Sequence, residues 1–249
     1  MLLTVLGSSG TYPTPGHPAS GYLIRDGETA LWVDAGSGTF AALQQHLDPA
    51  RLTALVLTHG HADHCVDFFS LFNMLRRPPG REEPTPVLAP PGVAERLASF
   101  AGAGPGHDLH RVFRFEEAES GGEALVGSIA LRFGAASHPV PAVSVRAESG
   151  GVVLAYSGDT GPGGGLVSIS RGAGALVCEA TFQGGRTVGD YPFHLFAAEA
   201  GAVAAEAGVE RLLITHIAPG LDPRVSVAEA SAAFGGPVEW AVPGMEVRV

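Results

Sequence analysis

Four side chains that can bind a metal ion fall within six positions of the segment Thr58-His59-Gly60-His61-Ala62-Asp63-His64. His59 and His61 are two positions apart, so in an extended chain their imidazoles point the same way and can hold one ion. Asp63 and His64 begin the next turn of the chain, so their side chains point in a different direction from those of His59 and His61 and suit a second ion. This mixture of imidazole and carboxylate favours zinc, with manganese or iron as alternatives. A His-rich surface loop is the other explanation, but this spacing is a more specific signal than a lone histidine.

A short buried strand is predicted to deliver these ligands. The apolar residues 52–57 precede them directly, and the glycine-containing break that follows turns the chain out of the sheet. Open α/β sheets tend to bind ligands at this end of their strands. We therefore expect the side chains in a cleft at a sheet edge.

Strands and helices alternate along the rest of the chain. Apolar patterns predict strands at 1–6, 20–25, 29–33, 86–89, 128–133, 143–147, 152–156, 175–178, 211–215 and 238–242. They predict helices at 40–47, 66–76, 93–100, 194–207 and 227–234. The chain has 249 residues, is 45% hydrophobic and contains no linker-like stretch, so we expect a single domain over residues 1–249.

The charge balance argues against a nucleic-acid partner. The formal net charge is −10, and all 15 basic residues are arginine. A nucleic-acid-binding surface would normally show a basic stripe. No apolar run approaches membrane-spanning length and no leader is evident, so we expect a cytoplasmic protein without a membrane partner. The sequence is compatible with a homodimer.

The two cysteines, Cys65 and Cys178, are too few for a disulfide framework. Both are expected to be core thiols. Cys65 directly follows His64 and is the alternative candidate for a metal ligand.

The segment from Thr58 to His64 resembles the signature of the metallo-β-lactamase superfamily. That resemblance implies an α/β (α+β) fold, a four-layer αββα sandwich with a binuclear metal site at one edge. It also implies three further ligands downstream, namely another histidine, a bridging aspartate and a final histidine after a late strand.

Three downstream residues match those expectations. His138 leaves a strand end as His59 does, and His216 follows the strand at 211–215. Asp159 lies in Tyr-Ser-Gly-Asp-Thr, which resembles the phosphodiesterase branch of the superfamily, although an aspartate after a strand can also simply form a turn. The resemblance thus implies two ligand groups with Asp159 between them: His59, His61 and His138 for one metal, and Asp63, His64 and His216 for the other.

Asp34, in Asp34-Ala35-Gly36, matches an Asp-x-Gly that supports the metal-binding loop in relatives of this superfamily. The alternative is a cap on the helix expected to begin near Thr39.

Two further segments resemble the ribonuclease Z-like branch. Cys178-Glu179-Ala180-Thr181 resembles its His-Glu-Ala-Thr, with cysteine in the first position, and His194 opens a predicted helix where the branch carries His-Ser-Thr. The resemblance implies that His194 contacts the scissile phosphate or protonates the leaving oxygen, and that Glu179 orients it. A capping or purely structural histidine is the alternative. Asp63 could also orient the attacking water.

An aspartate bridge without a cysteine ligand resembles ribonuclease Z and cyclic-nucleotide phosphodiesterases more than zinc β-lactamases. In such enzymes two adjacent ions activate water and stabilise charge on the phosphate. True transfer-RNA 3′ endonucleases insert a long basic arm between the third histidine and the bridging aspartate, whereas only twenty positions separate His138 from Asp159 here. The expected substrate is therefore a small phosphodiester such as cyclic AMP. The alternatives are a transfer-RNA 3′ endonuclease, a lactonase or thioesterase on the same metals, and a metal-bound scaffold without turnover.

Overall fold

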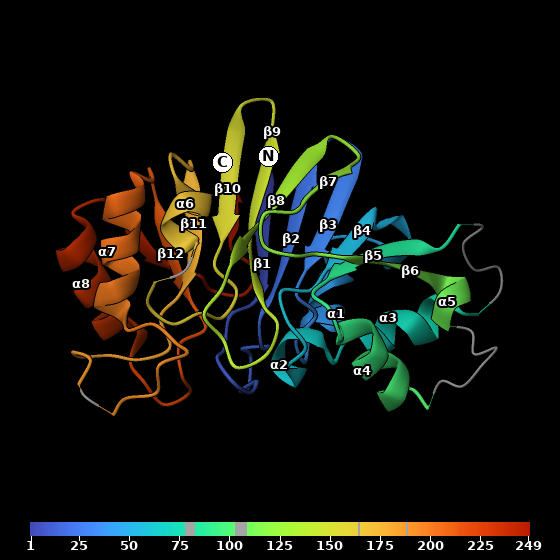
Figure 1. The fold of residues 1–249 in the computed structure, drawn as a ribbon, viewed down its shortest axis with the longest axis horizontal. Coiled ribbons are helices and arrows are strands. Elements are labelled where there is room, and N and C mark those ends of the chain that lie inside the picture. The colour runs from blue at the N-terminus through green and yellow to red at the C-terminus, as the bar shows by residue number, and fades with distance from the viewer. Residues whose placement is uncertain (78–82, 103–108, 164, 188) are drawn as a thin grey trace.

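Two mixed sheets of seven strands each lie face to face in the computed structural model, which describes residues 1–249 except 78–82, 103–108, 164 and 188. Helices cover the outer face of each sheet (Figure 1). The layers therefore follow the order helices, sheet, sheet, helices, which confirms the predicted αββα sandwich.

The first sheet has the strand order β14-β1-β2-β3-β4-β5-β6. Its strands are Leu2–Gly7 (β1), Gly21–Asp26 (β2), Thr29–Val33 (β3), Ala54–Val56 (β4), Thr85–Ala89 (β5), Phe113–Glu117 (β6) and Glu246–Arg248 (β14). Strands β3 to β6 run parallel, so their carboxyl ends share one edge of the sheet. The ligand-rich segment leaves β4 at that edge.

The second sheet has the order β13-β12-β11-β10-β9-β8-β7. Its strands are Glu123–Val126 (β7), Ile129–Ala135 (β8), Val143–Ser149 (β9), Val152–Tyr156 (β10), Ala175–Glu179 (β11), Leu212–Thr215 (β12) and Val238–Trp240 (β13). Strands β10 to β13 are parallel, and Asp159 and His216 follow the carboxyl ends of β10 and β12.

The helices divide between the two outer faces (Figure 1). On the first sheet lie Thr39–Leu43 (α1), Ala62–Cys65 (α2), Phe68–Leu75 (α3), Val93–Phe100 (α4) and Leu109–Val112 (α5), with a 3₁₀ turn at Pro49–Arg51. On the second lie Leu166–Ser170 (α6), Ala197–Ala207 (α7) and Pro223–Phe234 (α8). Within the described ranges, no helix has the length and apolar character needed to cross a membrane.

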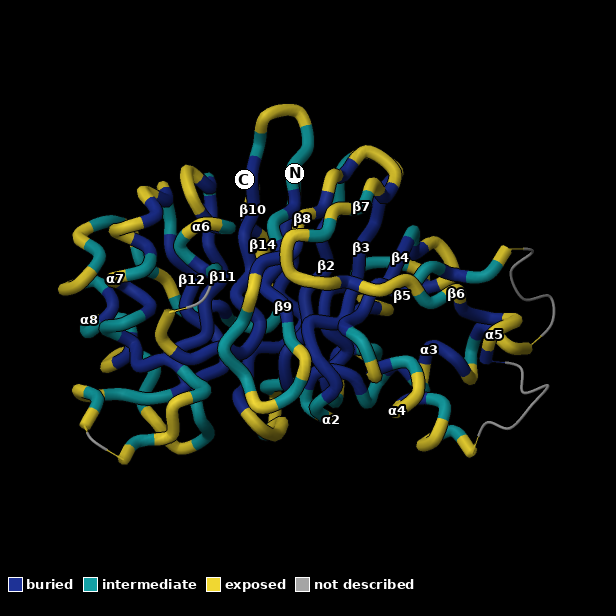
Figure 2. Tube along the Cα trace, viewed as in Figure 1, coloured by how far each residue is buried: buried dark blue, intermediate teal, exposed yellow. Residues whose placement is uncertain are grey.

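Buried side chains form one apolar cluster between the sheets and one beneath each helical layer. Strand β2 shows how the pleat produces this arrangement. Tyr22 and Ile24 pack between the sheets, whereas Leu23 packs against the helices of the first layer. Figure 2 shows burial concentrated along the strands and exposure at the hairpin tips. Fully burying one such side chain contributes about 1.5–3 kcal/mol.

Several predicted boundaries were wrong. The first helix ends at Leu43 instead of residue 47, and the helix predicted at 66–76 is α3, preceded by the separate short helix α2. The helix predicted to begin at His194 begins at Ala197. The reason is local: Phe196 has extended backbone, and the carboxylate of Glu199 accepts its N–H at 2.9 Å, which fixes the first helical turn there.

Candidate metal centre

The candidate centre forms where the two sheets meet at the edge that carries the ends of β4, β10 and β12. The loop after β4 is bonded directly to the opposite sheet, since the N–H of Val143 donates to the carbonyl of Thr58 at 3.0 Å. An isolated bridge joins His59 to Ala142. These backbone bonds hold the segment with His59 beside the loop that carries His138.

The first group of candidate ligands consists of His59, His61 and His138. Nε2 of His59 lies 3.1 Å from Nδ1 of His61, and that Nδ1 lies 3.1 Å from Nε2 of His138. His59 is fully buried, while the other two are partly exposed. Three ring nitrogens thus converge, as a histidine site for one metal ion requires.

The second group consists of Asp63, His64, Asp159 and His216. Nε2 of His64 lies 3.2 Å from Oδ1 of Asp159. Nε2 of His216 lies 3.4 Å from Oδ2 of both Asp63 and Asp159. Two imidazoles and two carboxylates therefore surround a second position.

Asp159 connects the two groups. Its Oδ2 also lies 3.7 Å from Nε2 of His59, while its Oδ1 faces His64. The structure therefore brings all seven predicted ligands together, with Asp159 in the position that a bridging carboxylate would need.

Unsatisfied polar atoms at the centre indicate that these residues fit metal ions. Nε2 of His64 and Oδ1 of Asp159 are buried and lie 3.2 Å apart, but neither atom makes a hydrogen bond of good geometry. Leaving such groups unpaired costs free energy, and a cation between them would remove that cost. The donor set of imidazole nitrogens and carboxylate oxygens suits zinc, manganese or iron.

The protonation states of His59, His138 and Asp159 already suit metal binding. At His64 and His216, burial acts to lower the pKa but Asp159 raises it, so a metal ion has to displace a proton there. Burial lowers the pKa of His59 well below its ordinary value and lowers the pKa of His138 to about 4. Burial alone would raise the pKa of Asp159, but the neighbouring His216 and His64 hold it well below its usual range. Neutral imidazoles and an ionised carboxylate are the forms that coordinate metals.

Asp34 holds the ligand segment in place through hydrogen bonds made on the side away from the metal positions. This fully buried carboxylate accepts the N–H of Thr58 at 2.8 Å, lies 2.7 Å from Nδ1 of His64 and accepts the hydroxyl of Tyr156 at 2.8 Å. Its contact with Nδ1 of His64 leaves Nε2 of that ring to face the centre. The first turn of α1 is capped instead by Asp67, which accepts the N–H of Phe40 at 2.8 Å.

His194 and Glu179 form a third set beside the metal positions. Nδ1 of His194 lies 3.1 Å from Oε1 of the fully buried Glu179, and the His194 ring stacks on His216 with centroids 5.4 Å apart. Glu179 also accepts the N–H of Thr160 at 2.6 Å and that of Leu195 at 3.1 Å. His194 is therefore positioned by a side chain that is itself fixed, although it does not open a helix as predicted.

Three residues at the centre had no role in the sequence-based prediction. The Thr181 hydroxyl lies 2.9 Å from Nδ1 of His216 and donates to Glu179 at 2.6 Å. Arg96, on α4, donates to the carbonyl of Gly60 in the metal-binding loop at 2.8 Å. The N–H of Thr11 lies 3.4 Å from Nε2 of His216. Of these, only Thr181 lay in a motif that could have pointed to it.

The backbone is strained in this region. Among the residues described, three other than glycine have positive φ: Thr11 at 62°, Asp34 at 57° and His216 at 52°. All three lie at or directly behind the candidate centre. Left-handed backbone at non-glycine positions costs free energy and persists where the surroundings enforce it.

Comparison with known proteins gives consistent matches. A family model described as "Beta-lactamase superfamily domain" matches residues 29–217. An uncharacterized protein of Mycobacterium tuberculosis is 38% identical over 247 residues, which cover 96% of this chain and 89% of that protein. A ribonuclease Z of Mycolicibacterium paratuberculosis is 31% identical over 243 residues, covering 88% of this chain and 86% of that protein.

The crystal structure of YhfI from Bacillus subtilis, a probable metallo-hydrolase, is also similar. It has a TM-score of 0.88 and 25% sequence identity, and the match covers 99% of this chain and 98% of YhfI. The residues matched by the family model include all seven candidate ligands, from His59 to His216.

Proposed function

The chain belongs to the β-lactamase superfamily, and we propose that it is a metal-dependent phosphodiesterase that hydrolyses small phosphodiesters such as cyclic nucleotides. Its relatives include metallo-hydrolases, which supports hydrolysis as the type of reaction.

The observation that carries the proposal is the position of Asp159 between two groups of nitrogen and oxygen ligands, with His194 beside them. We assign His59, His61 and His138 to one ion and Asp63, His64 and His216 to the other, with Asp159 shared. Zinc is the favoured metal. When bound, two such ions supply an activated water and stabilise negative charge on the phosphate.

The protein's own side chains would complete the reaction. Asp63 is 15% exposed at its side chain and reaches the centre from α2, where it can orient the attacking water. The carboxylate of Glu179 faces Nδ1 of His194, which leaves Nε2 to hold the proton destined for the leaving oxygen. A leaving alkoxide needs such a proton because it is strongly basic.

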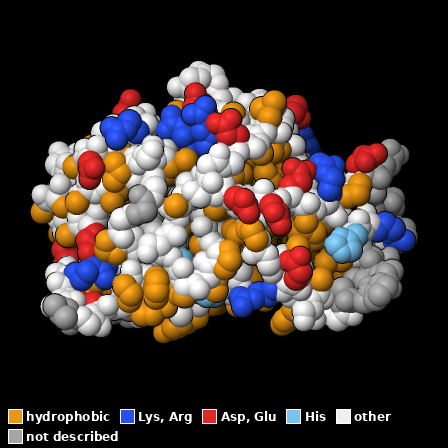
Figure 3. Space-filling view, viewed as in Figure 1, with side chains coloured by type: hydrophobic (Ala, Val, Ile, Leu, Met, Phe, Trp, Pro, Cys, Tyr) orange, Lys and Arg blue, Asp and Glu red, His pale blue; other side chains and the backbone are white. Residues whose placement is uncertain are grey.

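The short connection between the third histidine and the shared aspartate supports a small substrate. Between His138 and Asp159 lie only β9, a two-glycine turn and β10. On the face shown in Figure 3, basic side chains are scattered among acidic ones and form no continuous stripe. These features, with the net charge of −10, favour a small diester over a polynucleotide.

Cleavage of transfer RNA is the second candidate, because a protein named ribonuclease Z is 31% identical to this chain. A lactonase or thioesterase would use the same metals but has no specific observation in its favour.

The test is to incubate the metal-loaded protein with cyclic AMP, bis-p-nitrophenyl phosphate, a lactone and precursor transfer RNA. We expect turnover of both diesters with weak salt dependence, because few phosphate contacts are available. Asp63→Asn, measured in parallel, should be far slower and shows that the activity belongs to this site. Preferential cleavage of precursor transfer RNA, or of the lactone, would replace the proposal with the corresponding alternative.

A further inference from the structure

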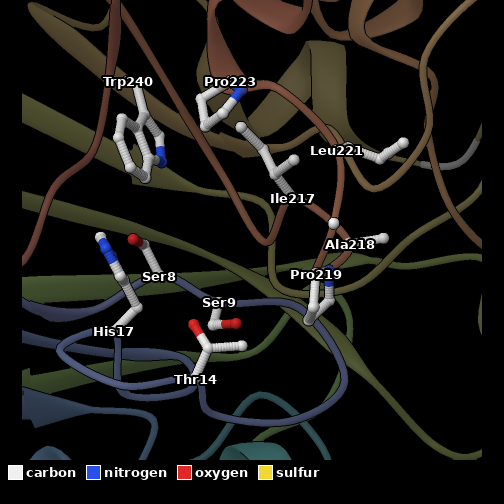
Figure 4. A pocket seen from close by; sticks show the side chains of 11 residues that line it. Ser8, Ser9, Thr14, His17, Ile217, Ala218, Pro219, Leu221, Pro223 and Trp240 are labelled. Carbon is white, nitrogen blue, oxygen red and sulfur yellow. The ribbon is translucent and has the colours of Figure 1, made fainter.

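A cavity of about 220 Å³ lies beside the candidate metal centre, between the loop that follows β1 and the loop that follows β12 (Figure 4). Complete pockets for small ligands usually measure about 300–1,000 Å³, so this one has the size for part of a ligand. None of the seven candidate metal ligands lines it.

Both loops that form the cavity also contact the metal centre. Ile217, which lines the cavity, is the neighbour of His216, and its carbonyl accepts the N–H of Gly10 at 3.1 Å. In the other loop, Ser9 and Thr14 line the cavity, while the N–H of Thr11 between them faces Nε2 of His216. Ile217 follows His216 in the chain, and consecutive Cα atoms are about 3.8 Å apart. One wall of the cavity is therefore only one residue away from a candidate ligand.

The cavity walls are aromatic and aliphatic. The rings of His17 and Trp240 stack with centroids 5.5 Å apart and an interplanar angle of 21°. Figure 4 shows this pair on one side of the space, with Ile217, Pro223 and Leu221 on another side. Flat surfaces of this kind suit a planar group that can stack.

Hydroxyl groups supply the polar part of the lining. Ser8, Ser9 and Thr14 lie near His17 in Figure 4, and each hydroxyl can accept a hydrogen bond, while that of Ser9 already donates to the carbonyl of Tyr12 at 2.8 Å. No arginine, aspartate or glutamate occurs among the lining residues that the structure describes. The cavity therefore suits an uncharged ring with hydrogen-bonding atoms at its edge, while the charged phosphate would stay with the metals.

We propose that this cavity is the subsite for the nucleobase of the substrate, with the base packed against the side of the stacked Trp240–His17 pair that lines the cavity. The inference rests on the proposed phosphodiesterase function and narrows the substrate from small phosphodiesters in general to those that carry a heteroaromatic base.

Kinetics with matched substrates test the subsite. We compare cyclic AMP with the base-free ribose 3′,5′-cyclic phosphate in the wild type, Trp240→Leu and His17→Ala. The wild type should prefer cyclic AMP, and each variant should lose this preference through a rise in KM of about 5- to 150-fold, the range measured for base stacking on aromatic side chains. His110→Ala, an exposed histidine on α5 outside the cavity, should keep the preference. Variants that keep the wild-type preference would overturn the subsite.

A binding measurement separates this inference from the proposed function. Adenosine has no phosphodiester to hydrolyse, so its binding to the metal-loaded protein does not depend on the reaction. Of the two tryptophans, Trp32 is fully buried, so we expect adenosine to change the fluorescence of Trp240 alone. The change should disappear in Trp240→Leu and weaken in His17→Ala. If millimolar adenosine leaves the fluorescence unchanged, the subsite is overturned, whether or not cyclic AMP is hydrolysed. A clear fluorescence change would support the subsite even for a protein that does not hydrolyse cyclic AMP.

Discussion

The carboxylate of Asp159 lies within reach of both ligand groups, so removing its charge should affect both ions. We expect Asp159→Asn to lower the metal content from about two ions per chain to one or fewer, because the amide is a neutral and weaker ligand. Elemental analysis of the purified proteins measures this directly.

Asp67→Asn is the matched control, since Asp67 is a half-buried carboxylate that caps α1 and does not face the metals. It should retain the wild-type metal content. An Asp159→Asn protein that still binds two ions would show that this aspartate does not bridge them.

His194 is held by Glu179 beside the centre but is not needed to hold the metals in the arrangement proposed above. We expect His194→Ala to keep its metal content and to lose about 10²- to 10⁴-fold in kcat with cyclic AMP, whose alkoxide leaving group needs a proton. With bis-p-nitrophenyl phosphate the loss should be small, because p-nitrophenolate leaves without protonation.

Tyr191→Phe provides the comparison, because the Tyr191 ring lies 5.7 Å from His194 and the substitution removes only a hydroxyl. It should behave like the wild type with both substrates. If wild type and His194→Ala hydrolyse both substrates at equal rates, the role of this histidine is structural and not catalytic.

At the scale of elements, helices α7 and α8 approach closely at Gly201. A Cβ at this position would collide with the carbonyl oxygen of Ala230 and lie 2.9 Å from Cβ of Ala233. Replacing glycine by alanine inside a helix normally stabilises the fold by about 0.5–1 kcal/mol, whereas overpacking destabilises it by about 1–3 kcal/mol. The collision should therefore outweigh the gain in helix stability. We expect Gly201→Ala to lower the free energy of unfolding in urea. Gly185→Ala is the control, since nothing lies near its added Cβ, and a stabilised Gly201→Ala would contradict the close packing.

The sequence predicted the central strands well, but of the four strands at sheet edges it predicted only β13. Residues of β1, β3 and β11 are almost all buried and form clear apolar runs. Strands β6, β7 and β14 were not predicted. They lie at sheet edges, and most of their residues are not buried, so they carry little apolar pattern.

Site residues could be predicted from the sequence where they are close together in the chain, but not where folding brings them together. Residues His59 to His64 are adjacent in sequence, so their spacing alone indicated a metal centre. Thr11 could not be found in this way, because its contact with His216 joins positions 205 residues apart and exists only in the folded chain. Residue patterns indicate local groups, whereas contacts between distant loops depend on how the two sheets pack.

At the scale of the whole molecule, stability should depend on pH through the histidines of the metal-free centre. Burial lowers the pKa of His59, His61 and His138, so below the ordinary value of 6.5 the unfolded chain takes up protons that the folded chain does not. Stability should therefore fall as pH falls below 6.5.

Two histidines act in the opposite direction. Burial would lower the pKa of His64 and His216, but Asp159 raises both above 6.5, so the folded chain keeps protons there that the unfolded chain releases. Their contribution is present below pH 6.5 and lost as pH rises through the raised values. The metal-free protein should thus be most stable near pH 6.5.

Thermal denaturation between pH 5 and 9 tests this expectation, with chelator in one series and zinc in the other. In the zinc series the decline above pH 6.5 should disappear, because metal ions replace the protons on these rings. A metal-free protein whose melting temperature rises steadily to pH 9 would contradict the assignment.

The left-handed backbone of Thr11, Asp34 and His216 has a consequence for how this protein can change. Each such residue costs about 1–3 kcal/mol, so selection for thermostability alone would favour glycine or a relaxed backbone at these three positions. Such changes would remove the side chains of Asp34 and His216, which hold and form the candidate centre, and would release the loop that lies against His216. Stability and activity therefore compete at these positions, and a more heat-resistant descendant would have to gain its stability elsewhere in the fold.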